Sequence, residues 1–211
     1  MPAIKQPLRY LALGDSYTIG EGVGATERFP HLAVLRLQLV GIPCEEPVYI
    51  ATTGWTTTDL IKALDSQSEL GIYDVVTLLI GVNDQYQKKD TGGYCARFTT
   101  LLDKAIVMAG NQSNHVFVLS IPDYSATPFV APDAKKQVHS EINSFNNINK
   151  TITQQKGAYY IDITPLTREA ATDPTLLTID GLHYLGKEHQ LWADLLASAI
   201  QKVVVRNGQT F

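Results

Sequence analysis

Five short runs of apolar residues recur along this chain, separated by segments in which apolar residues return at helical spacing. The runs contain almost no alternating polar positions, and they occupy residues 8–13, 48–51, 73–80, 116–121 and 159–163. Runs of this kind are typical of strands that are buried on both faces of a parallel sheet. This alternation constrains the fold of the chain more than any other feature of its sequence.

The segments between these runs carry stripes of apolar residues with the period of an α-helix. The clearest stripe is the last one along the chain, and the shortest lies between Leu60 and Leu64. We expect the stripes to face the sheet, which leaves no surplus apolar stripe for an obligate interface. The other stripes are Leu32, Leu35 and Leu39; Phe98, Leu101, Leu102, Ala105 and Ile106; Val138, Ile142, Phe145, Ile148 and Ile152; and Trp192, Leu195, Leu196, Ala199, Ile200, Val203 and Val204.

Strands that alternate with helices in this way predict an α/β fold, a three-layer α/β/α sandwich around a five-stranded parallel sheet with right-handed crossovers. The chain has no Pro/Ser-rich linker, no break in composition and no internal repeat. We therefore expect one domain over residues 1–211.

Composition and charge exclude several classes of protein. The chain has 211 residues, of which 45% are hydrophobic and 18% charged, and such a chain buries a full core and is not disordered. Its net charge is −4 and its Lys and Arg residues form no cluster, which argues against binding nucleic acid through phosphate neutralisation. The longest apolar run, residues 75–80, is far shorter than the ~18 residues that a membrane-spanning helix needs.

The cysteine and histidine residues predict neither a disulfide framework nor a metal site. Cys44 and Cys95 are too few for a set of disulfides or a four-ligand zinc site, and we interpret them as small buried hydrophobes of a reducing compartment. No pair of the remaining histidines has the spacing of metal ligands, and we expect no metal and no cofactor. These histidines are His31, His115, His139 and His189.

The amino-terminal residues 1–7 contain no apolar run of the kind found in signal peptides. The expected location is therefore cytoplasmic if Met1 is the native start. It is secreted or periplasmic if the sequence is a mature form.

Polar groups with catalytic potential follow four of the five predicted strands. The segments are 14–17 (Gly-Asp-Ser-Tyr), 52–55 (Thr-Thr-Gly-Trp), 81–84 (Gly-Val-Asn-Asp) and 180–183 (Asp-Gly-Leu-His). In open α/β sheets, ligands bind at the carboxyl ends of the strands, so these segments should meet at one edge. Only the exit of the fourth strand, 122–124, offers no obvious catalytic group.

These groups are the ones that acyl transfer needs. Serine is a weak nucleophile until a base removes its proton, and His183 can do so for Ser16. Asp180 lies three residues before His183 and can fix the tautomer and orientation of its ring. The Ser16 and Gly54 amides and the Asn83 side chain can stabilise the oxyanion, each worth roughly 3 kcal/mol of the barrier.

Each of these residues also has a purely structural interpretation. Asp15 and Ser16 can cap the turn that follows the first strand, and Gly54 can be a turn glycine. Asn83 is equally suited to a helix start, and Asp180 with its glycine is a common turn pair. The coincidence of four such groups at one edge is what favours catalysis.

The four segments resemble, in order and in spacing, the four sequence blocks of the SGNH hydrolases, the superfamily of GDSL-type esterases and lipases. The resemblance extends from residue 8 to about residue 205. Tyr17 stands where the family often has leucine. The resemblance implies a flavodoxin-like fold, Ser16 as nucleophile, Asp180 and His183 as the rest of a catalytic triad, and an oxyanion hole of the Ser16 amide, Gly54 and Asn83.

The substrate implied by this resemblance is a small-molecule ester. Trp55, Tyr86, Tyr124 and Phe129 lie on loops near the predicted site, where they either line a substrate pocket or pack the loops onto the sheet. The insertion at residues 125–133 is the best candidate for a specificity loop. The glycine-rich segment 20–24 does not fit a dinucleotide or phosphate loop and is interpreted as a flexible loop beside the site.

Three functions remain in competition at this point. The leading one is a serine ester hydrolase that works through an acyl-enzyme. The second is an O-acyltransferase or a carbohydrate acetylesterase that uses the same site on a sugar ester. The third is a flavodoxin-like binding module without catalysis, which would have no need for the pair Asp180 and His183.

Overall fold

The described strands form one parallel sheet. The computed structural model describes residues 6–67, 71–87 and 91–206, so the residues 1–5 that enter the signal-peptide prediction lie outside it. The sheet has the order β2-β1-β3-β4-β5, and every neighbouring pair is parallel. The strands are β1 (Tyr10–Gly14), β2 (Val48–Ala51), β3 (Val75–Leu79), β4 (Val116–Leu119) and β5 (Tyr159–Ile161).

This arrangement confirms the predicted fold class. Strands β1, β3 and β4 are buried along their whole length, as their uninterrupted apolar sequences indicate. The strand order is the one found in flavodoxin-like sheets, in which the chain switches direction between β1 and β3. The carboxyl ends of these two strands are therefore where a ligand site is expected.

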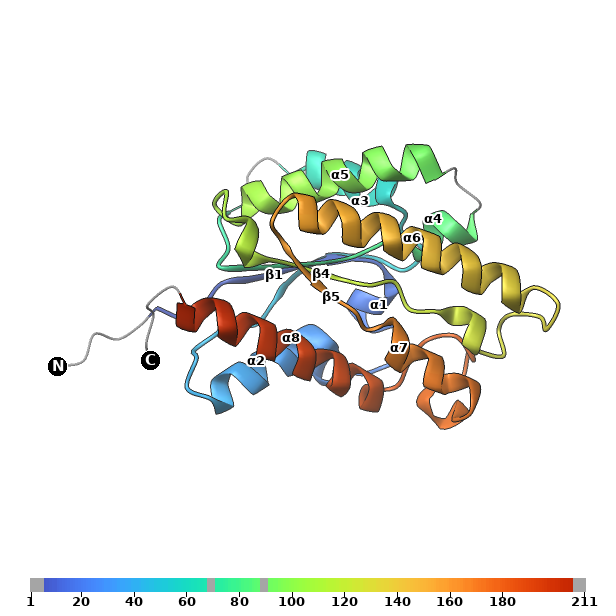
Figure 1. Ribbon diagram of the computed structural model, residues 1–211. Helices are drawn as coiled ribbons and strands as arrows, with labels where there is room; N and C mark the ends of the chain where they lie inside the picture. Colours follow the sequence, from blue (N-terminus) through green and yellow to red (C-terminus); the bar gives the residue numbers. More distant parts are fainter. Residues whose placement is uncertain (1–5, 68–70, 88–90, 207–211) are drawn as a thin grey trace.

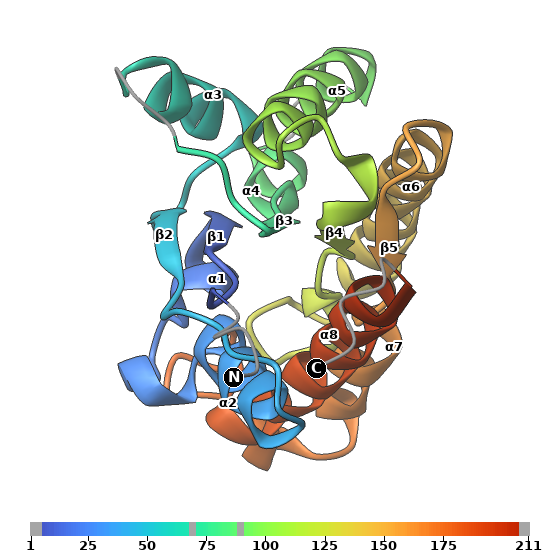
Figure 2. The same ribbon diagram turned by 90° about the vertical axis from the view of Figure 1, so that its left-hand side faces the viewer.

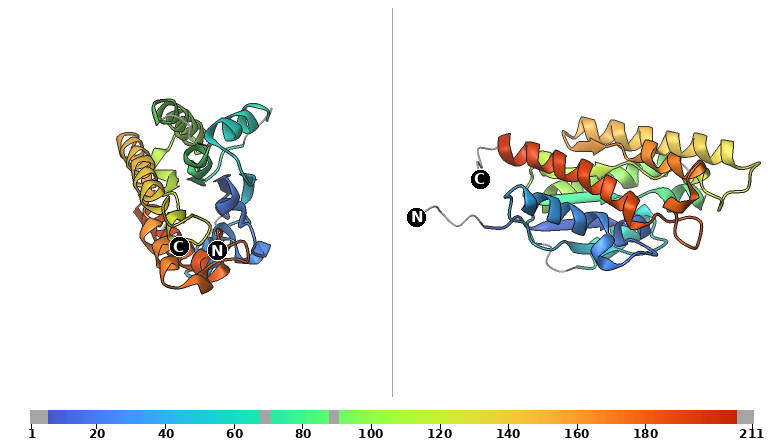
Figure 3. Two further views of the ribbon diagram at one scale, coloured as in Figure 1. Left: turned by 90° about the vertical axis from the view of Figure 1, so that its right-hand side faces the viewer. Right: turned by 90° about the horizontal axis from the view of Figure 1, so that it is seen from below.

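Helices cover both faces of the sheet. Helices α3, α5 and α6 lie on one face, and α2 and α8 lie on the other (Figures 1 and 2). Figure 3 shows α2 and α8 side by side on their face of the sheet. The long helices are α2 (Phe29–Leu39), α3 (Thr57–Asp65), α5 (Thr91–Met108), α6 (Lys135–Gln155) and α8 (Gly186–Arg206).

Three short helices and several single 3₁₀ turns join these elements. No apolar stripe predicted them, because each is about one turn long. The short helices are α1 (Ser16–Ile19), α4 (Val82–Tyr86) and α7 (Thr164–Thr167), and the 3₁₀ turns are Ala25–Glu27, Ser113–His115, Tyr124–Ala126, Arg168–Ala171 and Pro174–Leu176. Two of the short helices, α1 and α4, directly follow the central strands and carry candidate site residues.

The predicted apolar stripes are only partly correct. In α2, Leu35 and Leu39 are exposed, with 37% and 78% of their surface accessible, and the buried face includes Phe29, Ala33 and Leu37 instead. Helix α2 is apolar almost all the way round, so residue spacing alone does not identify its buried face. In α8, Leu195 is also exposed, whereas Trp192, Leu196 and Ile200 of the same stripe are buried. Of the two cysteines expected to be buried, Cys44 is buried and Cys95 is exposed. Within the described part of the chain, no helix is both long enough and apolar enough to span a membrane.

Candidate active site

Ser16 is positioned by a tight turn at the end of β1. A Cβ atom at Gly14 would overlap with the carbonyl oxygen of Leu79, so only glycine lets β1 lie this close to β3. Asp15 then caps α1, since its Oδ1 accepts a hydrogen bond from the Tyr17 amide at 3.1 Å. The capping role considered for Asp15 is therefore present. Because Asp15 is the cap, Ser16 is the first residue of α1, and it lines the cavity described below.

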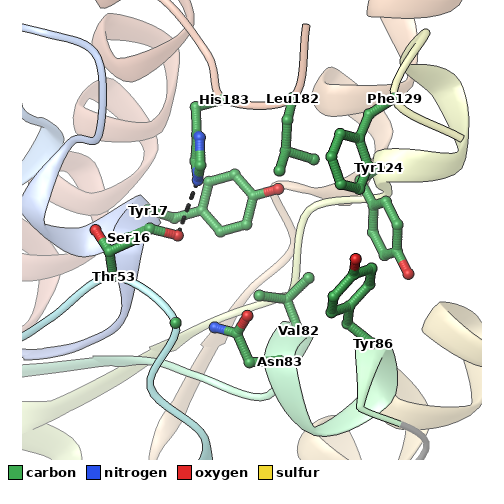
Figure 4. Close-up of a pocket in the computed structure, with 11 residues that line it drawn as sticks. Ser16, Tyr17, Thr53, Val82, Asn83, Tyr86, Tyr124, Phe129, Leu182 and His183 are labelled. Atoms are coloured by element: carbon green, nitrogen blue, oxygen red, sulfur yellow. Dashed lines mark hydrogen bonds between the residues drawn. The ribbon is translucent and has the colours of Figure 1, made fainter. Parts of the chain in front are cut away.

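The structure brings Ser16, His183 and Asp180 into one chain of hydrogen bonds. Nε2 of His183 lies 2.9 Å from Oγ of Ser16, and Nδ1 of His183 lies 2.6 Å from Oδ2 of Asp180. Figure 4 shows the first of these contacts at one side of a cavity. The Tyr17 ring packs behind the imidazole, with ring centroids 5.3 Å apart. The arrangement has the connectivity of a nucleophile, a base and an orienting carboxylate.

The Asp180 carboxylate is fixed by further hydrogen bonds. Its Oδ1 accepts from the Thr178 hydroxyl at 2.6 Å, from the Leu182 amide at 2.8 Å and from the His183 amide at 3.0 Å. Partial burial opposes ionisation of Asp180, but the hydrogen bonds from His183, Thr178 and Leu182 outweigh it and hold the pKa of this carboxyl well below its usual range. Asp180 therefore stays charged and can stabilise a protonated imidazole.

Three residues that line the cavity have an N–H group available to a ligand. In the part of the chain that the structure describes, the backbone amides of Ser16 and Gly54 have no intramolecular acceptor. Gly54 has φ +82°, a conformation that favours glycine. One N–H of the Asn83 side chain donates to the Trp55 carbonyl at 3.0 Å, which leaves the second available to a ligand.

The cavity beside Ser16 is small and largely apolar. Its volume is about 160 Å³, close to that of cavities known to hold a single benzene molecule. Figure 4 shows Ser16, Asn83 and His183 on one side and the aromatic residues on the other. The cavity is lined by Ser16, Tyr17, Thr53, Gly54, Val82, Asn83, Tyr86, Tyr124, Phe129, Leu182 and His183.

Three aromatic side chains form the far wall of this cavity. The rings of Tyr86, Tyr124 and Phe129 contact one another, with centroid separations of 6.1 to 6.4 Å. Tyr124 is buried, and its hydroxyl donates to Oε1 of Gln85 at 2.7 Å, whereas Tyr86 and Phe129 are exposed. Burial raises the pKa of Tyr124 to about 12, so this hydroxyl remains protonated at neutral pH.

The structure places three of the four predicted aromatic residues at the cavity. Tyr86, Tyr124 and Phe129 line the cavity, but Trp55 does not and instead packs against the core. The fourth strand exit, which offered no catalytic group in the sequence, supplies Tyr124. Phe129 belongs to the insertion at 125–133, so this segment reaches the cavity.

Sequence reasoning missed several residues of the site. Thr53 and Val82 line the cavity. The only indication of this in the sequence is that they are adjacent to the predicted residues Gly54 and Asn83. Thr178 lies two residues before Asp180, but a threonine at that spacing does not by itself indicate a contact with the carboxylate.

The glycine-rich segment 20–24 lies next to the site, as expected. Glu21 accepts a hydrogen bond from the Thr53 hydroxyl, and a Cβ at Gly22 would lie 2.7 Å from a methyl group of Thr178.

No metal centre is apparent among the residues for which the structure gives positions, because no three His, Cys, Asp or Glu side chains are grouped to hold an ion. His31 contacts Glu46, and His139 contacts Asp123. His189 accepts a hydrogen bond from the Phe29 amide through Nδ1. Each of these three histidines therefore has a structural partner.

The sequence matches the model of the GDSL-like lipase/acylhydrolase family over residues 12–191. This match includes the candidate residues Ser16, Gly54, Asn83, Asp180 and His183. A search of curated protein sequences returned no match.

Solved structures of esterases share the fold. An acetylxylan esterase from Geobacillus stearothermophilus is 18% identical with a TM-score of 0.71, and the match covers 93% of this chain and 95% of that one. A lipase/acylhydrolase from Enterococcus faecalis is 21% identical with a TM-score of 0.67 and coverage of 92% and 96%. A psychrotrophic esterase from a Pseudoalteromonas species is 18% identical with a TM-score of 0.71 and coverage of 92% and 97%.

Proposed function

Because the chain belongs to the GDSL-like lipase/acylhydrolase family and is a carboxylic ester hydrolase, we propose that it cleaves its substrate through an acyl-enzyme on Ser16. In this mechanism His183 is the general base and Asp180 orients it. The observation that carries the proposal is the unbroken chain of contacts from Asp180 Oδ2 through His183 to Ser16 Oγ, at 2.6 and 2.9 Å.

The reaction follows from this geometry in two steps. His183 Nε2 takes the Ser16 proton while Oγ forms a bond to the ester carbonyl carbon, and the protonated ring then gives this proton to the departing alcohol oxygen. A water molecule next gives a proton to His183 while its oxygen attacks the acyl carbon. The protonated ring then returns this proton to Ser16 Oγ as the bond between Oγ and the acyl carbon breaks, which releases the acid and restores Ser16. In both steps the Asp180 carboxylate stabilises the positive charge on the imidazole.

The oxyanion of each tetrahedral intermediate needs hydrogen-bond donors that are already in place. The Ser16 and Gly54 amides and the Asn83 side chain supply three such donors in this proposal. Loss of one such donor typically lowers kcat by about 10²- to 10³-fold.

The size of the cavity supports a small ester as substrate. A volume of about 160 Å³ suits a group of roughly benzene size. Its wall of Val82, Leu182 and aromatic rings is mainly apolar and offers no opposite charge to a charged group. We therefore assign short-chain or small aromatic esters to this enzyme.

A carbohydrate acetyl ester is the second candidate. It is favoured by the exposed rings of Tyr86 and Phe129, 57% and 46% accessible, which present flat apolar faces beside the cavity. A sugar ring can pack on such faces, and one of the solved structures with this fold acts on acetylxylan. Comparison of an acetylated xylooligosaccharide with p-nitrophenyl acetate as substrates decides between the two candidates.

Replacement of the nucleophile tests the mechanism. Ser16→Ala is expected to abolish turnover of p-nitrophenyl acetate and labelling by a fluorophosphonate probe, with the melting temperature almost unchanged. Ser144→Ala, at an exposed serine of α6, is the matched control and should keep both. Retained turnover in Ser16→Ala contradicts the proposal.

Product analysis addresses the acyltransferase alternative. With a competing alcohol in the assay, a hydrolase yields mainly the free acid. A dominant yield of the new ester would identify the acceptor as an alcohol instead of water.

A further inference from the structure

Two of the proposed oxyanion donors come from separate loops. Gly54 lies between β2 and α3, and Asn83 lies at the start of α4, after β3. Strands β2 and β3 are not neighbours, because β1 lies between them. Within the described chain, no backbone hydrogen bond joins residues 52–57 to residues 81–87. The sheet sets the approximate separation of the two segments through β1, and the direct links between them are side-chain contacts.

A buried cluster next to both donors makes this connection. Asp84 has no accessible surface, and its carboxylate accepts from the Thr57 amide at 2.7 Å and from the Thr57 hydroxyl at 2.6 Å. Arg97 of α5 donates through Nη2 to Asp84 at 3.2 Å and through Nε to the Thr57 hydroxyl at 2.8 Å. We call Asp84, Thr57 and Arg97 the Asp84 cluster.

The Asp84 cluster lies within a few residues of each donor. Asp84 directly follows Asn83, and Thr57 follows Gly54 by three residues. Asn83 also reaches the same loop, since its side chain donates to the Trp55 carbonyl at 3.0 Å. Asn83 and Asp84 of α4 therefore both contact the segment that follows Gly54. Arg97 of α5 donates to both partners of the contact between Asp84 and Thr57.

The chemistry of the cluster indicates a positional role. A carboxylate without access to water is costly unless charged and polar partners satisfy it. Apolar residues of similar volume often stabilise a fold as well as a buried ion pair does. The hydrogen bonds of this cluster are directional, so they fix the spacing of the two loops more tightly than apolar packing would.

We infer that Asp84, Thr57 and Arg97 are positioning residues, which hold Gly54 and Asn83 at the separation that the oxyanion requires. This inference rests on the proposed function, because it assumes that Gly54 and Asn83 stabilise the oxyanion formed after attack by Ser16. A shift of about 1 Å in such donors is enough to lower a rate about 10²-fold.

The test compares two threonine hydroxyls that are both fully buried. Thr57→Val removes the hydroxyl that links Asp84 to Arg97, and it is expected to lower kcat by about 10- to 100-fold with KM changed less than about twofold. Thr57→Ser keeps the hydroxyl and should recover most of kcat. Thr153→Val on α6 removes a hydroxyl that donates to the Asn149 carbonyl, and it should destabilise the fold without lowering kcat.

A double-mutant cycle connects the effect to the oxyanion. In an Asn83→Ala background, Thr57→Val should lower kcat much less than it does in the native enzyme, because one positioned donor is already absent. If Thr57→Val does not fold, Arg97→Lys keeps the charge and loses the paired contacts, with the same expected fall in kcat. Circular dichroism and melting curves establish folding for every variant.

Several results would overturn the inference. These are an unchanged kcat in a folded Thr57→Val or Arg97→Lys variant, an equal loss in Thr153→Val, a rise in KM in place of a fall in kcat, or full additivity in the double mutant. Activity retained by Ser16→Ala overturns the proposed function instead. The two failures are thus distinguishable.

Discussion

At the scale of single residues, hydrogen bonds on a carboxylate determine how the proposed base is held. Asp180 accepts four hydrogen bonds, of which two come from backbone amides and two from the side chains of Thr178 and His183. The Thr178 hydroxyl is the one contact on Oδ1 that a side-chain substitution removes. Its loss leaves only the two backbone amides to hold Oδ1 and thereby the orientation of the carboxylate toward the imidazole.

Thr178→Val is therefore expected to lower kcat by about tenfold, which corresponds to the ~1.5 kcal/mol typical of a hydrogen bond to a charged group. Steady-state kinetics on p-nitrophenyl acetate measures the effect. Thr178→Ser keeps the hydroxyl and is the matched control, which should remain close to the native enzyme. An unchanged kcat in Thr178→Val means that the two amides alone are enough to orient Asp180.

A second residue-scale feature is the buried carboxyl beside the nucleophile. Burial raises the pKa of Asp15 to about 8, and the nearby Asp84 adds to this effect. Its Oδ2 has no hydrogen-bond partner within the described chain. Burial therefore favours the protonated form of Asp15, whose Oδ1 caps α1.

At the scale of secondary-structure elements, the pairing of α2 with α8 depends on a neutral histidine. His189 of α8 accepts a hydrogen bond at 3.2 Å from the amide of Phe29, the first residue of α2. The two rings are also stacked, with centroids 6.2 Å apart. Burial lowers the pKa of His189 to about 3, with a smaller effect from His183, so the ring stays neutral and its Nδ1 remains an acceptor.

This pairing predicts acid destabilisation. In the unfolded chain a histidine titrates near ~6.5, so below that pH the unfolded state binds a proton that the folded state does not. The contribution of His189 is therefore complete above pH ~6.5 and declines as the pH falls toward 3. Unfolding by urea at a series of pH values measures it.

His189→Asn keeps an acceptor for the Phe29 amide but does not titrate. Its unfolding free energy should change with pH less steeply than that of the native protein between pH 6.5 and 4, by up to ~1.4 kcal/mol per pH unit. Equal slopes for the two proteins would show that His189 takes up its proton without loss of stability.

At the scale of the whole molecule, the sheet topology gathers the site and the loops limit its size. The switch in strand order between β1 and β3 places Ser16 and Asn83 at the same edge, and the loop before α8 brings Asp180 and His183 to them. The turn Tyr124–Ala126 and the segment after it add Tyr124 and Phe129. These loops leave a cavity of about 160 Å³.

The size of this cavity predicts a preference for short acyl chains. Across p-nitrophenyl esters from acetyl to palmitoyl, kcat/KM is expected to be highest for acetyl to butyryl and to fall more than about tenfold by octanoyl, since a longer chain leaves apolar surface in water. Phe129→Ala enlarges the cavity and should shift the preference toward longer chains. Equal or higher turnover of the palmitoyl ester contradicts the assignment to short esters.

The sequence by itself determined the fold class and the candidate catalytic groups. Buried parallel strands need continuous apolar runs, and this requirement is visible in the chain itself. The match of four blocks likewise pointed to the family, while the expected single domain over residues 1–211 and the roles of Ser16, Asp180 and His183 stay predictions. The cap of α1 is also encoded locally, because the Asp15 side chain accepts from an amide only two residues further on.

Only the tertiary structure decided the features that depend on distant partners. Residue spacing did not show that Leu35 and Leu39 face solvent, because α2 is apolar all round and the contact with α8 selects its buried face. It did not separate Trp55 from Tyr86, since both were expected on loops, whereas Tyr86 is the last residue of α4. Nor did it join Asp84 of α4 to Arg97 of α5, a side-chain contact that no spacing along the chain reveals. Contacts between elements carry no period along the chain, and so packing alone fixes them.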